Sequence, residues 1–152
     1  MMRVGFHVKS LLVFSSVLVF QMEMGAASSQ PPPDDALRTL EAIFQDEKAT
    51  LLKQLVSPER KTYLSSPGLD INDGYYSGDQ VLLLFQDAFR FRTSVRFSFL
   101  KGADPPPEAG RVQAVARWTY RQGKSKDRTV QLAFTLIRRE GGWLLKEIRE
   151  IP

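Results

Sequence analysis

The sequence contains no cysteine, and its single histidine is His7. The absence of cysteine excludes disulfide bridges, thiolate metal sites and cysteine nucleophiles. His7 lies in a segment that we expect to be removed, so the mature chain would also lack the commonest general base and metal ligand. The sequence also has no phosphate-binding loop, metal-ligand cluster or nucleophile elbow. We therefore expect no metal and no cofactor.

The first 27 residues have the pattern of a secretory signal peptide. Arg3 and Lys9 precede the apolar stretch Leu11–Phe20, and Gly25-Ala26-Ala27 places small residues at the expected cleavage site. The uncharged stretch Ser10–Met22 has 13 residues, whereas a membrane-spanning helix needs about 20. This pattern predicts a secreted or periplasmic protein that begins near Ser28 and has no membrane span after cleavage.

The remaining 125 residues are enough for one ordinary domain. Residues 28–34 contain three consecutive prolines and are interpreted as a spacer, and residues 35–152 as a single domain. The domain divides by charge: residues 28–89 hold 5 basic and 10 acidic side chains, and residues 90–152 hold 14 basic and 6 acidic ones. The chain is therefore an acidic half followed by a basic half.

Two helices are predicted before the chain changes to strands. Apolar residues recur every three or four positions after Asp35, which predicts a helix over residues 35–56. Residues 61–65 are expected to form a short edge strand, and residues 67–74 a loop. Ser77 and Gln80 form a capping box, which predicts a buried second helix from Ser77 to Phe89.

From Thr93 the apolar period becomes two, which predicts half-buried antiparallel strands over residues 95–99, 112–120 and 130–136. Matching their apolar faces places Trp118 opposite Leu132, with residues 123–127 as the turn. Glu140-Gly141-Gly142 predicts a tight turn into a fourth strand, residues 143–151. The irregular alternation of that strand predicts a bulge or burial on both faces. Residues 101–110 are expected to be a loop.

Two helices followed by a curved antiparallel sheet is the order of the nuclear transport factor 2-like (cystatin-like) superfamily. The segments Tyr76-Ser77-Gly78-Asp79-Gln80 and Gly142-Trp143-Leu144-Leu145-Lys146-Glu147-Ile148 resemble a family of small exported bacterial domains of unknown function within it. The resemblance implies an α+β cone in which the sheet wraps the helices and whose open end often holds a ligand or an active site. It implies no particular activity, because one fold serves many functions.

The candidate site residues form two groups. An aromatic group on the predicted concave face could line a pocket for an apolar ligand or fill the core: Phe97, Trp118, Tyr120 and Phe134. An arginine group on the polar face could bind an anion or a partner protein, or remain solvated: Arg96, Arg117 and Arg149. Catalytic residues are not identified.

We therefore expect an exported, non-enzymatic domain that binds a small apolar or anionic ligand or an envelope partner protein. The alternative is a lyase- or isomerase-like enzyme, because the resemblance implies a carboxylate and a tyrosine in the cone; Asp79 or Asp87 with Tyr75, Tyr76 or Tyr120 would supply them. Nucleic acid is not expected as a partner, because no recognition motif accompanies the basic balance. The charge division predicts a monomer or a salt-sensitive weak oligomer.

Overall fold

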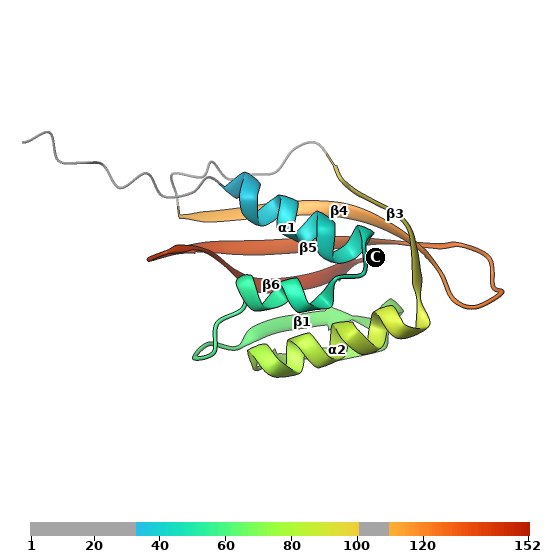
Figure 1. Cartoon of the computed structure of the whole chain (residues 1–152), viewed down its shortest axis with the longest axis horizontal. Coiled ribbons are helices and arrows are strands. Elements are labelled where there is room, and N and C mark those ends of the chain that lie inside the picture. The colour runs from blue at the N-terminus through green and yellow to red at the C-terminus, as the bar shows by residue number, and fades with distance from the viewer. Residues whose placement is uncertain (1–32, 101–109) are drawn as a thin grey trace, which may run out of the picture.

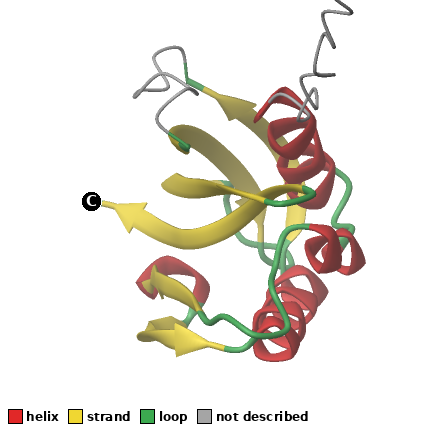
Figure 2. Cartoon of the chain, turned by 90° about the vertical axis from the view of Figure 1, so that its left-hand side faces the viewer, coloured by secondary structure: helices red, strands yellow, loops and turns green. Residues whose placement is uncertain are grey.

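A six-stranded sheet and a layer of helices make up the protein, as Figure 1 shows for the computed structural model, which describes residues 33–100 and 110–152. The elements in chain order are α1 (Pro33–Gln45), η1 (Ala49–Gln54), β1 (Thr62–Ser66), η2 (Pro67–Leu69), β2 (Ile71–Tyr76), α2 (Gly78–Phe91), β3 (Thr93–Phe99), β4 (Arg111–Arg121), β5 (Arg128–Arg139) and β6 (Gly142–Ile151). Figure 2 shows α1, η1 and α2 stacked along one side of the sheet. Among the described residues, none of these three helices covers the other side of the sheet, which we call the outer face (Figure 2).

The first helical segment is broken, so the prediction of one helix over residues 35–56 is wrong. α1 ends at Gln45, and the short helix η1 begins at Ala49. Between them Glu47 has a φ of +57°, a left-handed conformation that no helix can continue through. The turn is held from elsewhere, because Ser94 donates its backbone N–H to the Glu47 carboxylate at 2.6 Å. A tertiary contact therefore overrides the helical period.

The second helix begins as predicted. Ser77 is the N-cap of α2, its hydroxyl accepts a hydrogen bond from the backbone N–H of Gln80, and the Gln80 side chain accepts one from the Ser77 N–H. One face of α2 is buried, including Val81, Phe85 and Phe89. The capping box thus sets where α2 starts, but the helix is buried on one face only, because Leu83 and Phe91 are exposed.

The strand order is β2-β1-β6-β5-β4-β3, so two sequence predictions need correction. The strand predicted at residues 61–65 is not an edge strand, because β1 lies between β2 and β6 and pairs in parallel with β6. The segment predicted as a loop, residues 67–74, contains η2 and most of β2. Asp70 makes this possible, because its φ of +59° reverses the chain between β1 and β2. The two edge strands are β2 and β3.

The pairing of β4 with β5 differs by two residues from the predicted register. Trp118 lies opposite Val130, and Leu132 lies opposite Ala116. A shift of two leaves each side chain on its predicted face, because side chains alternate with a period of two. The apolar pattern therefore predicted correctly which face of β4 and β5 is buried. It could not distinguish two registers that bury the same side chains.

Irregularities in β3 and β6 decide which side chains face the helices. The bulge predicted in the last strand is confirmed, because the pairing shifts between Leu145 and Glu147, which brings Trp143, Leu145 and Ile148 onto the buried face. A second shift, near Val95, was not predicted. It leaves Val95 exposed, although the alternation predicted its burial with Phe97.

The core is centred on Phe44 of α1, which is fully buried. Its ring contacts five other rings at centroid distances between 5.0 and 5.7 Å: those of Phe85, Phe89, Phe97, Trp118 and Phe134. These rings come from α2, β3, β4 and β5, so one side chain joins the helical layer to the sheet. The interior between the two layers is therefore filled by aromatic side chains.

Two sequence predictions lie outside the described residues: the signal peptide and nearly all of the loop predicted at residues 101–110. Within the described ranges, no helix is long and apolar enough to span a membrane.

Candidate anion-binding site

The predicted aromatic group is assembled by the fold, but it lies within the core. Phe97, Trp118, Tyr120 and Phe134 are each at most 4% exposed. Trp118 Nε1 donates to Ser94 Oγ at 3.0 Å, and the Tyr120 hydroxyl donates to the Gly68 carbonyl at 3.0 Å. Their polar atoms are therefore already used by the protein, and ligand contact by these rings stays a prediction.

The carboxylates considered for catalysis both lie on α2 and are exposed. Asp79 lies in the first turn of the helix, and Asp87 lies in its second half. The Tyr76 hydroxyl donates to the Asn72 carbonyl at 2.8 Å, and Tyr75 is 68% exposed. Neither carboxylate is among the residues buried between helices and sheet. The described residues thus do not assemble a buried acid next to a free tyrosine.

The three predicted arginines lie on the outer face, but they are not equivalent. Glu147 accepts a hydrogen bond from Arg149 Nε at 2.7 Å, which raises the pKa of the Arg149 guanidinium. The charge of Arg149 is therefore already balanced. The guanidinium groups of Arg96 and Arg117 form no hydrogen bond or ion pair with any described residue.

Arg96 and Arg117 share a small cleft on neighbouring strands. Arg96 lies opposite Thr119, and Arg117 lies opposite Ser98, so two guanidinium groups and two hydroxyls alternate around a cavity of about 290 Å³. Guanidinium and hydroxyl donors of this kind suit a carboxylate or a phosphate. We call these four residues the arginine cleft.

A second cavity lies where β1 separates from β6. Only Tyr63, Leu64 and Ser65 of β1 pair with β6, and they pair with its second half. The segment before β1 is tied to Leu145 at two points: Leu145 N–H donates to the Leu55 carbonyl at 2.7 Å, and Thr62 Oγ1 donates to the Leu145 carbonyl at 3.1 Å. Residues 56–61 bow away from β6 between these points, which opens the cavity.

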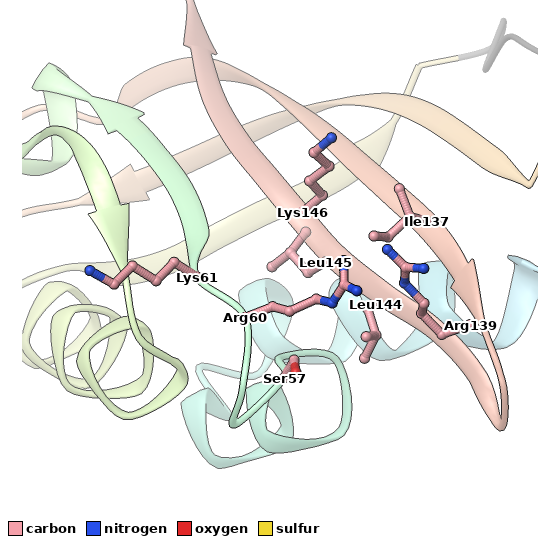
Figure 3. A pocket seen from close by; sticks show the side chains of 8 residues that line it. All are labelled: Ser57, Arg60, Lys61, Ile137, Arg139, Leu144, Leu145 and Lys146. Carbon is pink, nitrogen blue, oxygen red and sulfur yellow. The ribbon is translucent and has the colours of Figure 1, made fainter.

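The cavity, which we call the cationic pocket, has a volume of about 220 Å³. Figure 3 shows the residues that line it: Ser57, Arg60, Lys61, Ile137, Arg139, Leu144, Leu145 and Lys146. In this view the guanidinium groups of Arg60 and Arg139 are directed toward each other across Leu144. The ammonium groups of Lys61 and Lys146 point outward at the rim.

Among the described residues, the four cations of the cationic pocket have no acidic partner. Within residues 33–100 and 110–152, all ion pairs are formed by other side chains. Glu59 and Glu140 are chain neighbours of Arg60 and Arg139, but neither lines the pocket. The base of the pocket is apolar, because Ile137, Leu144 and Leu145 contribute to it. An anion with a small apolar part matches both features.

The charge pattern of the sequence places most basic side chains in the second half of the chain and does not predict this pocket. Arg60 and Lys61 come from the acidic half, and only the unpredicted parallel pairing of β1 with β6 brings them to Arg139 and Lys146. The one available signal was the pair of adjacent cations at positions 60 and 61. Described residues also include no cluster of three acidic or histidine side chains that could hold a metal ion.

Comparisons with solved structures find the same architecture in several bacterial proteins. A DUF4783 family protein from Bacteroides ovatus superposes with a TM-score of 0.59 at 12% identity, covering 74% of this chain and 90% of its own. A hypothetical protein with a ketosteroid isomerase-like fold from Catenulispora acidiphila, in complex with trimethylamine, gives a TM-score of 0.59 at 10% identity, with 82% and 87% covered. A protein from Kribbella flavida gives a TM-score of 0.59 at 11% identity. The match covers 77% of this chain and 85% of the Kribbella protein.

These similarities support the predicted α+β fold of the nuclear transport factor 2-like type, with helices on a mostly antiparallel, open sheet. The likeness to small bacterial domains of unknown function is confirmed at the level of the fold. No protein-family model matches the chain, and no curated protein matches it significantly. At these identities the comparisons identify the fold and no activity.

Proposed function

We propose that this protein is an exported, non-enzymatic binding domain that holds a small amphipathic anion in the cationic pocket. One observation carries the proposal: the guanidinium groups of Arg60 and Arg139 face each other over an apolar-based cavity with two lysines at its rim (Figure 3), and none of these four cations has an acidic partner among the described residues. Like charges gathered without counterions repel one another, and a bound anion relieves that repulsion. Arg60 and Arg139 would hold the anion, and the two lysines would attract it.

The size and shape of the cavity limit the ligand. A volume of about 220 Å³ is below the roughly 300 to 1,000 Å³ of most drug-sized sites. A carboxylate, sulfonate or phosphate group with a short apolar or aromatic part matches it. The planar guanidinium groups favour a flat, bidentate anion over a halide.

Export is the second part of this proposal, and it is supported by the charged, apolar and small-residue order of residues 1–27. We expect protein recovered from the exported fraction of its native host to begin at or near Ser28. N-terminal sequencing measures this directly. An intact Met1 on protein recovered from the cytoplasm would contradict export and leave the binding proposal untouched.

Binding is tested by titrating phenyl phosphate into the protein by calorimetry, with benzyl alcohol as an uncharged aromatic of similar size. We expect saturable binding of phenyl phosphate and none of benzyl alcohol at the same concentrations. Arg139→Gln should weaken phenyl phosphate binding about tenfold, because a hydrogen bond to a charged group contributes roughly 1.5 to 3 kcal/mol before solvent screening. Arg60→Gln should have a similar effect.

The matched control is Arg128→Gln, which removes the same charge from the far end of the same strand. It should bind phenyl phosphate as the unchanged protein does. Equal weakening by Arg128→Gln and Arg139→Gln would mean that only net charge matters. That result would contradict a site at the cationic pocket.

A further inference from the structure

The cationic pocket and the arginine cleft lie on one surface. Residues with odd numbers on β4 and β5 share the outer face, because Arg117 pairs with Gln131 and Arg111 pairs with Ile137. Arg139 is therefore on the same face as Arg96 and Arg117. Arg111, which is exposed and unpaired among the described residues, lies beside the pocket residue Ile137.

The two cationic clusters are far apart. Arg117 lies across from Gln131, and Arg139 is eight residues further along β5. At about 3.3 Å per residue, the clusters are separated by about 26 Å. One small anion cannot contact both, so a partner that occupies the whole face must carry repeated negative charges.

Little negative charge remains on this face. Glu147 forms an ion pair with Arg149. Asp73 accepts a hydrogen bond from Ser65 at 2.8 Å, and its negative charge also helps to raise the pKa of Arg149. Most other acids of the first half of the domain lie on the helical side, including Asp79 and Asp87 on α2. The protein thus has a basic side and an acidic side. Such a charge distribution would turn the basic side toward an anionic surface.

The outer face also carries an aromatic pair. Tyr63 and Tyr75 lie opposite each other on β1 and β2, with ring centroids 5.2 Å apart, and the Arg149 guanidinium lies 5.1 Å from the Tyr63 ring. Tyr75 is 68% exposed. Exposed tyrosines beside cations suit the boundary between lipid headgroups and water, because the ring is apolar and the hydroxyl stays wet.

We propose that the outer face docks on an anionic phospholipid bilayer, with one lipid phosphate in the cationic pocket and others at the arginine cleft. The proposal rests on the proposed anion site and extends it to a surface. A bilayer is favoured over a linear polyanion for two reasons. The stretch between the clusters, which includes Ala133 and Thr135, offers no continuous cationic track among the described residues, because Arg149 beside Ala133 is already paired with Glu147. The apolar pocket base and the exposed tyrosine pair suit the boundary between lipid headgroups and water.

Vesicle co-sedimentation tests the proposal. The proposed mature protein, which would begin near Ser28, is mixed with phosphatidylcholine vesicles, or with vesicles that contain phosphatidylglycerol as well, at low and high salt. We expect binding to the anionic vesicles alone, and its loss at high salt, because salt screens exposed charges. The double variants Arg60→Gln/Arg139→Gln and Arg96→Gln/Arg117→Gln should each reduce binding at least about tenfold, because each cation near the bilayer adds to the affinity.

The matched control is Lys53→Gln/Arg90→Gln, which removes two cations from the helical layer. All variants keep the same N-terminal segment, so differences come from the substituted side chains. Equal loss with this control, or equal binding to neutral vesicles, would overturn the proposal. Phenyl phosphate binding without vesicle binding would overturn it and leave the proposed anion site intact. If the protein bound soluble dextran sulfate more tightly than anionic vesicles, the partner would be a linear polyanion. That result would also overturn the bilayer proposal.

Discussion

Replacing Phe44 with alanine is expected to lower the free energy of unfolding by about 3 to 5 kcal/mol. Phe44 is fully buried, and its ring contacts rings from α2, β3, β4 and β5. Truncation would leave a cavity lined by five rings. These rings belong to four different elements, so they cannot all move together to fill it. Denaturant unfolding measures the loss, and Phe85→Ala and Phe134→Ala, which remove two of its fully buried partners, should fall in the same range.

Leu83→Ala is the control for this prediction, because Leu83 is 62% exposed on α2. It should change stability by no more than about 0.5 kcal/mol. A Phe44→Ala protein as stable as the Leu83→Ala protein would contradict the packing of α1 onto the sheet. It would also reopen the predicted role of the aromatic group as a ligand pocket.

Asp70→Asn is expected to cost about 1 to 3 kcal/mol, the second largest effect. Arg92 is buried, its side chain being 5% exposed, and it donates to Asp70 Oδ2 at 2.6 Å. Its guanidinium also lies 5.6 Å from the Tyr120 ring. Asparagine keeps the left-handed backbone of Asp70, whose φ is +59°. The substitution therefore removes the countercharge and little else, leaving a buried cation without its partner.

The reciprocal change, Arg92→Met, should cost less than Asp70→Asn. It removes the buried charge itself together with Arg92 Nε, which is buried and has no hydrogen-bond partner among the described residues. Thermal unfolding of both variants at one pH makes the comparison. A greater loss from Arg92→Met would mean that the arginine stabilises the fold through packing and ring contact more than it costs as a buried charge.

Local patterns predicted the parts of the fold that depend on near neighbours. The capping box at Ser77 needs only residues three positions apart, and the turn at Gly141 and Gly142 needs a backbone with positive φ, which glycine tolerates. The alternation in β4 and β5 identified their buried faces. The irregular spacing around Lys146 predicted a bulge or burial on both faces, and of these two the structure shows the bulge in β6.

Long-range contacts determined what the sequence could not predict. The break at Glu47 depends on a hydrogen bond from Ser94, 47 positions later. The parallel pairing of β1 with β6 joins residues more than 80 positions apart, and it creates the cationic pocket. One miss is local: Arg149 was predicted to bind an anion or a partner protein or to remain solvated, whereas its guanidinium pairs with Glu147, two positions earlier on the same strand. Charge counts cannot reveal such pairing.

The central claim, that the cationic pocket binds an anion, is tested most directly by following backbone amide chemical shifts while phenyl phosphate is added. We expect the largest changes at Arg60, Arg139 and Leu144, with smaller changes at Lys61, Ile137, Leu145 and Lys146 (Figure 3). Largest changes along α2, or at the core residues Phe97, Trp118, Tyr120 and Phe134, with none around Leu144, would contradict it.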